Sequence, residues 1–197
     1  MYCWGSNIYG QSGQPSGDKF LTPQLVSGIS NVTQISVHNR HSCALSDGKV
    51  FCWGSNEVGR LGDGTTTDSS SPVSIASNKT FTQVSVGFEH SCAITDEEEL
   101  YCWGNSNTGE FGADPVSVPA DNVPFKTNLV GVKKVEAGRG STCVVLAVGT
   151  VACTGDNSRG QLGIGNTQNQ NSPVQVGNNI DWTQISSKGN FFRISFL

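Results

Sequence analysis

The segment HSCALSDGKVFCWGSNEVGRLGDG, residues 41–64, decides the fold. Two short apolar runs, 43–45 and 50–52, flank Asp47-Gly48. An Asp-Gly pair between apolar runs is a strong hairpin signal, because a type I′ turn needs positive φ at both central positions. Spaced glycines follow Trp53, and no stretch of the chain shows helical periodicity. The segment therefore predicts a β-hairpin followed by a polar, glycine-rich loop.

The same segment returns along the chain with a period of about 50 residues. Cys-Trp-Gly begins at residues 3, 52 and 102, and Cys-Thr-Gly at 153. The motif at 41–43 recurs at 90–92 and 141–143, and an alternating polar–apolar run recurs at 33–36, 82–85, 133–136 and 183–186. A fixed period indicates a repeat architecture in which each unit buries its faces against its neighbours. We therefore predict one repeat array over 1–197, divided into a partial repeat 2–28, repeats 29–78, 79–128 and 129–178, and a divergent partial repeat 179–197.

Each repeat is expected to form about four short strands, the content of one propeller blade. In the first full repeat these strands are predicted near 32–37, 43–46, 49–53 and 73–76. The class is all-β, and two arrangements remain: an open arc of about four antiparallel, four-stranded blades, or a four-bladed ring closed between the two ends. Ring closure would set Arg193 opposite Cys3, which is a poor pairing, so the open arc is favoured.

Residues 41–64, and with more drift 90–112 and 141–165, resemble the repeat of the regulator of chromosome condensation family. The resemblance implies a β-propeller, usually of seven blades, of which this chain would be an incomplete part. Plant ultraviolet photoreceptors of the family use Trp beside the His motif, whereas residues 39–41 here are Asn-Arg-His. Photoreception is therefore not supported, and the fold alone does not fix the function.

Six of the seven cysteines form one pair per repeat, at 43/52, 92/102 and 143/153. A two-residue turn at 47–48 sets Cys43 opposite Cys52 in a non-hydrogen-bonded pair, where Cα atoms approach to about 4.5 Å. This distance suits a disulfide. The third pair fits a turn with Gly149 in the left-handed position, and the second would place Glu98 there. The alternative is that small buried cysteines simply suit a strand.

The cysteines also bear on metal binding and on location. No Cys-x-x-Cys occurs, so a structural zinc site is not expected. Disulfides indicate an extracellular or secretory-lumen location, the alternative being cytoplasmic. Residues 1–5 do not resemble a signal peptide. Cys3 lacks a hairpin partner and is expected to be a free thiol.

Composition excludes several classes of function. The net charge is −4 and no basic cluster exceeds Lys133-Lys134, so nucleic-acid binding is not expected. The chain has no run of eighteen apolar residues, so no membrane insertion is expected. No spacing completes a catalytic triad or a phosphate loop, so we predict no enzyme activity, no metal and no cofactor.

Residues locked to the repeat are predicted to be structural. His41 and His90 occupy one repeat position and are expected to bond the backbone of the next blade. The Trp residues at the end of the predicted hairpins are expected to anchor blade packing: Trp4, Trp53 and Trp103. The resemblance places three charged residues toward the central funnel as interface candidates: Arg40, Glu89 and Arg139.

The predicted function is a non-catalytic scaffold that presents propeller loops to a protein partner of unknown identity. The alternative is guanine-nucleotide exchange on a small GTPase, which the founding family member performs. Exchange in that protein is associated with a wedge-like insertion. The repeats here differ in length by about one residue, which leaves no room for such an insertion.

Overall fold

The computed structural model describes residues 1–115 and 121–195, and its regular elements in these ranges are all strands. None of the described residues forms a helix that could cross a membrane. Two-stranded sheets lie at the ends: β1 (Tyr2–Ser6) with β2 (Lys19–Leu25), and β15 (Gln184–Ser187) with β16 (Phe192–Ser195). Between them are three four-stranded sheets: β3 (Val32–His38), β4 (His41–Ser46), β5 (Lys49–Gly54) and β6 (Ser69–Ser74); β7 (Phe81–Val86), β8 (His90–Thr95), β9 (Glu99–Gly104) and β10 (Asp121–Val130); β11 (Val132–Ala137), β12 (Ser141–Leu146), β13 (Val151–Gly155) and β14 (Gln170–Gln175).

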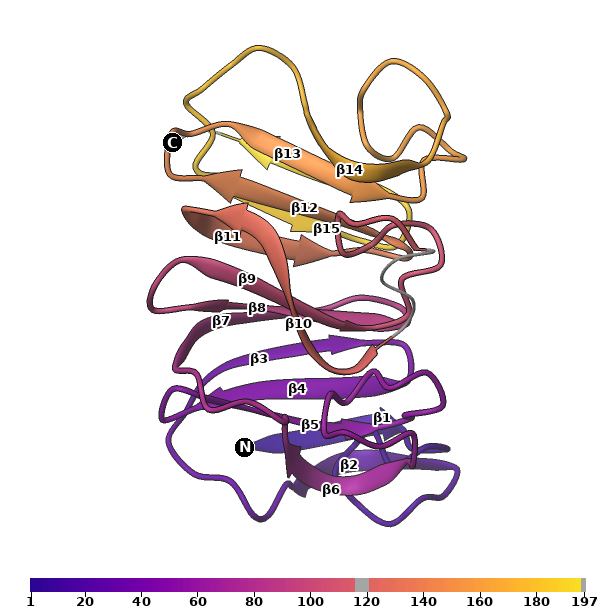
Figure 1. Cartoon of the computed structure of the whole chain (residues 1–197). Coiled ribbons are helices and arrows are strands. Elements are labelled where there is room, and N and C mark those ends of the chain that lie inside the picture. The colour runs from indigo at the N-terminus through magenta and orange to yellow at the C-terminus, as the bar shows by residue number, and fades with distance from the viewer. Residues whose placement is uncertain (116–120, 196–197) are drawn as a thin grey trace.

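Each four-stranded sheet is an antiparallel meander in chain order, and the sheets follow one another from the N-terminal to the C-terminal end (Figure 1). The first strands β3, β7, β11 and β15 pack against one another in succession and so form the inner side. The two end sheets are not hydrogen-bonded to each other. The fold is therefore an open arc of propeller blades, and the expected all-β propeller class is confirmed.

The turns of the blade hairpins have the predicted geometry. Asp47 and Gly48 have φ of 48° and 75°, and Ser46 pairs with Lys49. In the next two blades Glu98 and Gly149 occupy the left-handed position, with φ of 61° and 78°. These turns set the register of each hairpin, because a one-residue slip would invert every side chain of the strand.

The fourth strand of the first full blade lies earlier than predicted. The expected span was 73–76, whereas β6 runs over Ser69–Ser74 and contains Pro72. Among the described strands it pairs only with β5, so it is an edge strand. Proline is tolerated on an edge because its missing N–H can face away from the ladder, and treating Pro72 as a strand breaker caused the error.

The core lies between blades. One cluster joins Leu45 and Val50 of the first full blade to Val84 and Trp103 of the second. Trp53 and Trp103 are 1% and 0% exposed, whereas Trp4 is 64% exposed. Trp53 and Trp103 each contact the sheet that precedes their own, and the described residues contain no sheet before that of Trp4.

Candidate interaction face at the inner hairpins

The two histidines that share one repeat position, His41 and His90, bridge successive blades. His41 Nε2 lies 2.8 Å from Ser91 Oγ, and His90 Nε2 lies 2.9 Å from Thr142 Oγ1. The partners are side-chain hydroxyls rather than the backbone, so that part of the prediction was wrong. The hydroxyls follow the His position on β8 and β12, and strand alternation points them across the blade boundary.

The protonation of this bridge follows from its contacts. Ser91 Oγ donates its one proton to the Arg60 carbonyl at 3.1 Å, so His41 must donate through Nε2–H. Burial, followed by the charge of Arg60, holds the pKa of His41 well below its usual 6.5. Burial lowers the pKa of His90 to about 3. A histidine beside a serine can serve as base and nucleophile, but this hydroxyl points at a carbonyl in a fully buried site and suits a structural role.

The indoles connect the same blades. Trp53 Nε1 donates to the Gln11 carbonyl at 3.0 Å, and Trp103 Nε1 donates to the Arg60 carbonyl at 2.9 Å. Both acceptors lie in the glycine-rich loop of the preceding sheet. Each of these buried indoles therefore has its N–H satisfied by a backbone carbonyl of the preceding sheet.

Three cross-strand disulfides join Cys43 to Cys52, Cys92 to Cys102 and Cys143 to Cys153, each with a Cα–Cα distance of 4.1 Å. Each pair sits directly opposite across its own hairpin. Cys3 is the free cysteine of the described chain, and burial raises the pKa of its thiol. The cysteine-paired form of the repeat is therefore confirmed.

The predicted interface residues lie on the turns between the first and second strands of each blade, residues 39–40, 87–89 and 138–140, which we call the inner hairpin face. Arg40 Nη1 pairs with Glu57 Oε1 at 3.0 Å, and its guanidinium stacks 5.1 Å from the Tyr9 ring centroid. Arg60 Nη2 reaches the same Glu57 oxygen at 3.1 Å. Glu57 therefore links Arg40 of this face to the buried Arg60 of the glycine-rich loop.

The turns of this face contact one another across blade boundaries. The Arg139 guanidinium lies 5.2 Å from the centroid of Phe88, and the His38 ring meets Phe88 edge-on at 5.9 Å. Phe88 N–H donates to the Gly138 carbonyl, and Arg139 N–H to the Gly189 carbonyl, both at 3.0 Å. Burial and the Arg139 charge lower the pKa of His38. These contacts make the turns a continuous platform.

Glu89, the remaining predicted interface residue, accepts from Asn105 Nδ2 at 2.8 Å and belongs to the same face. Arg40, Glu89 and Arg139 are thus brought together by three successive turns but make no direct contact that would define a catalytic centre. Sequence reasoning missed Tyr9, His38 and Phe88. The sequence signal that could have identified them is an aromatic ring in or just before a turn. Such a ring does not recur at a fixed position of the repeat, so the repeat pattern does not reveal it.

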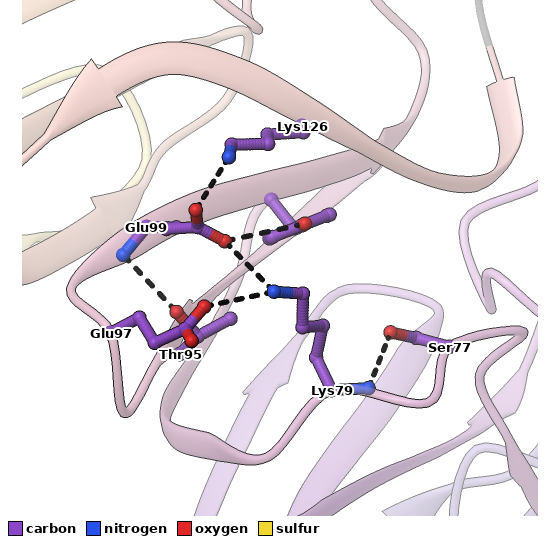
Figure 2. Close-up of polar contacts among 7 residues, drawn as sticks. Ser77, Lys79, Thr95, Glu97, Glu99 and Lys126 are labelled. Atoms are coloured by element: carbon purple, nitrogen blue, oxygen red, sulfur yellow. Dashed lines mark hydrogen bonds and ion pairs between the residues drawn. The ribbon is translucent and has the colours of Figure 1, made fainter.

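The opposite ends of the strands carry an ion-pair network (Figure 2). Lys79 Nζ lies 2.9 Å from Glu97 Oε2 and 3.3 Å from Glu99 Oε2, and Lys126 pairs with the other oxygen of Glu99. The Lys126 ammonium, and then Lys79, lowers the pKa of Glu99. The carboxylates of Glu97 and Glu99 are therefore already paired with lysine ammonium groups.

No group of three metal-ligating side chains occurs within residues 1–115 and 121–195. A pocket of about 580 Å³ lies beside the turn at 147–149. Its lining includes Lys133, Lys134 and Asp181 but no histidine or cysteine. The pocket does not offer a nucleophile with an adjacent base.

The comparisons with known proteins agree on the fold. Two models of the regulator of chromosome condensation (RCC1) repeat match the chain, one over residues 1–45, 47–94 and 149–191, the other over 32–60, 81–110 and 132–161. Human WBSCR16 matches 94% of this chain with a TM-score of 0.84 at 23% identity. Yeast RCC1 (Prp20) bound to Kap60 matches 98% with a TM-score of 0.84 at 23% identity. The chain spans about half of those structures, 50% and 48% respectively.

A more distant match is the ectodomain of the Physcomitrella patens receptor kinase CR4. It covers 93% of this chain and 40% of that ectodomain, with a TM-score of 0.51 at 20% identity. At these identities the likeness concerns the fold alone.

Proposed function

Because the chain belongs to the RCC1 repeat family, we propose that it is a non-catalytic protein-interaction module. The inner hairpin face is its binding surface, and Arg40, Glu89 and Arg139 are its partner-contacting residues. The observation that carries the proposal is the platform formed by Phe88, Arg139 and the inter-turn backbone hydrogen bonds. A rigid scaffold that presents loops is suited to binding without any catalytic group.

The composition of the face supports this role. Arginine and aromatic side chains are enriched in protein interfaces, where they supply large contact areas at low entropic cost. Arg40 on Tyr9 and Arg139 on Phe88 are two such pairs, each held before a partner arrives. Preorganised side chains lose less conformational freedom on binding, which favours affinity.

The test compares two double variants with matched loss of charge. R40A/R139A changes the inner hairpin face, and K126A/K133A removes two positive charges at the opposite strand ends. A partner captured by the wild-type protein is identified, and its affinity is measured by calorimetry. We expect a loss of at least about tenfold for the first variant and little change for the control. Equal affinity of R40A/R139A and wild type would refute this surface.

The alternative function is guanine-nucleotide exchange on a small GTPase. Its support is the fold match to yeast RCC1 (Prp20), and a second Prp20p structure is described by its binding properties to Gsp1p and histones. The assay is release of labelled nucleotide from a Ran-type GTPase. Accelerated release would establish exchange and replace the scaffold role, whereas unchanged release supports the scaffold.

We also propose an extracellular or secretory-lumen location for the protein. The support is the set of three hairpin disulfides, because such bonds persist in oxidising compartments. Alkylation of thiols in intact cells before lysis tests the location. If the six paired cysteines are disulfide-bonded in the cell and escape alkylation, the location is supported. Alkylation of all seven cysteines contradicts it.

A further inference from the structure

Two asparagines begin the sequence Asn-x-Thr, and the proposed binding surface uses neither of them. The tripeptides are Asn31-Val32-Thr33 and Asn78-Lys79-Thr80, and Pro is absent from both middle positions. Asn-x-Thr is an acceptor sequence for N-linked glycosylation of secreted proteins. Asn31 lies two residues before the Thr-Gln pair at 33–34, whereas Asn78 lies four residues before the pair at 82–83. The two asparagines occupy different positions of the repeat, so the repeat architecture does not account for them.

Both asparagines lie in linkers that join the outer strand of one sheet to the inner strand of the next. Asn31 lies between β2 and β3, and Asn78 lies between β6 and β7. Both are exposed, and so are the hydroxyl-bearing residues Thr33 and Thr80. A glycan is bulky and has to stay on the surface of the folded protein. The two linkers meet this requirement, because neither asparagine belongs to the core between blades.

The fold does not depend on either asparagine side chain. Asn31 Nδ2 donates to Asp47 Oδ2 at 3.2 Å in an exposed contact. One sugar on Nδ2 leaves a second N–H on the same nitrogen, so this hydrogen bond can persist. Asn78 is the central residue of a turn in which the Lys79 N–H donates to Ser77 Oγ at 3.2 Å (Figure 2). The Asn78 side chain makes no hydrogen bond in the part of the chain that the structure describes, so attachment there displaces none.

Both acceptor sequences adjoin the same hairpin turn, Asp47-Gly48 of the first full blade. Asn31 contacts Asp47 through its side chain. The second linker packs against Gly48, whose carbonyl accepts from the Phe81 N–H at 2.8 Å. A Cβ on Gly48 would lie 2.9 Å from Thr80 Cγ2, which shows how closely this linker approaches the turn. Glycans on the two asparagines would therefore surround one turn.

This turn lies at the opposite end of the strands from the inner hairpin face. Each of the two linkers precedes the first strand of a blade, whereas the inner hairpin turns at 39–40 and 87–89 follow that strand. β3 has 7 residues and β7 has 6, so each strand separates its two ends by about 20 Å, at about 3.3 Å per residue. The attachment points are therefore remote from the proposed binding surface.

We propose that Asn31 and Asn78 carry N-linked glycans that cover the strand ends around Asp47-Gly48. The proposal rests on the extracellular or secretory-lumen location proposed above. The donor is an oligosaccharide joined to a lipid diphosphate, and a transferase of the secretory pathway catalyses the transfer. Asparagine Nδ2 forms a bond to C1 of the first sugar and the C1–O bond to the diphosphate breaks. The lipid diphosphate leaves with the electron pair of that bond, and one amide proton is released. Coverage of these strand ends directs protein partners to the inner hairpin face.

Peptide mapping by mass spectrometry, on the protein isolated from the cells that make it, tests the proposal. After digestion with a peptide N-glycosidase in heavy-oxygen water, we expect labelled aspartate at residues 31 and 78. Unmodified asparagine at both residues would overturn the proposal, and at one of them would overturn it for that residue. Alkylation of the same sample separates this result from the proposed location. An unmodified chain with its three disulfides refutes the glycans alone, whereas an unmodified chain with seven free thiols refutes both proposals.

Variants produced in the same cells assign each glycan. N31Q and N78Q should each lose one glycan, seen as a step in electrophoretic mobility, and N31Q/N78Q should match the enzymatically deglycosylated protein. T80S retains the acceptor sequence and should keep both glycans, whereas T80V, which is similar in shape to the wild type, should lose the glycan at residue 78. The control N107Q changes an exposed asparagine outside any acceptor sequence and should migrate as the wild type. A glycan retained by N31Q/N78Q would overturn the assignment.

Discussion

Acidification should destabilise the blade junctions through the two buried histidines. Burial lowers the pKa of His41 well below 6.5 and that of His90 to about 3, whereas both groups titrate near 6.5 in the unfolded chain. Below that pH the unfolded state therefore binds more protons than the folded state. The free energy of unfolding consequently decreases as the pH is lowered.

The size of the effect follows from how far the pH is lowered below the unfolded-state pKa of 6.5. At pH 5.5, one unit below the unfolded pKa, each imidazole that stays neutral in the fold costs about 1.4 kcal/mol. His41 and His90 together should lower the free energy of unfolding by about 3 kcal/mol between pH 7.5 and pH 5.5. His38, whose pKa is also lowered, adds to the loss. Glu110 and Glu136, whose pKa values burial raises, act in the opposite direction at lower pH.

Urea denaturation at the two pH values measures this difference. The H41Q/H90Q variant keeps polar side chains of similar size but cannot titrate, so its stability should change little over the same window. Equal stability of the wild type at pH 7.5 and 5.5 would refute the reasoning. A variant with the same pH dependence as the wild type would refute it as well, because the protons would then bind elsewhere.

Three further outcomes are expected. Each hairpin disulfide spans 9 or 10 residues and should stabilise the fold by about 2.7 kcal/mol in the chain-entropy model. Thiol titration of the denatured, non-reduced chain should detect one reactive thiol, that of Cys3. Seven reactive thiols would contradict the pairing. Burial raises the pKa of Glu110, so E110Q should raise the melting temperature at neutral pH and lose that gain in acid as the native carboxyl protonates; lower stability of E110Q at neutral pH would be the contrary result. G149A should lose at least about 2 kcal/mol in urea unfolding, since φ is 78° and a Cβ would collide with the Ile180 carbonyl; wild-type stability of G149A would exclude that clash.

The hairpins were predictable because their contacts are local. The turn at Asp47-Gly48 sets the register of β4 against β5, and this register brings Cys43 opposite Cys52. The outer strand was misplaced because its position depends on the length of the loop before Pro72 and on its being an edge, which no local pattern records.

The candidate site was predictable only in outline. Repeat position placed Arg40, Glu89 and Arg139 on equivalent turns, but their neighbours come from other blades. Phe88 lies between His38 and Arg139, which are about 50 residues from it in each direction. Such contacts depend on the twist and spacing of the sheets.

The amino-acid sequence by itself determined the repeat period, the all-β class and the disulfide hairpins, because each rests on residues within one turn or one fixed period. Only the tertiary structure decided that His41 bonds the Ser91 hydroxyl and that Gln34 and Ser36 satisfy the N–H groups of the next inner strand. These contacts form between blades, where rotation of one sheet relative to the next selects which side chains meet. The strand pattern sets which residues face a neighbour, and blade packing sets which atoms they reach.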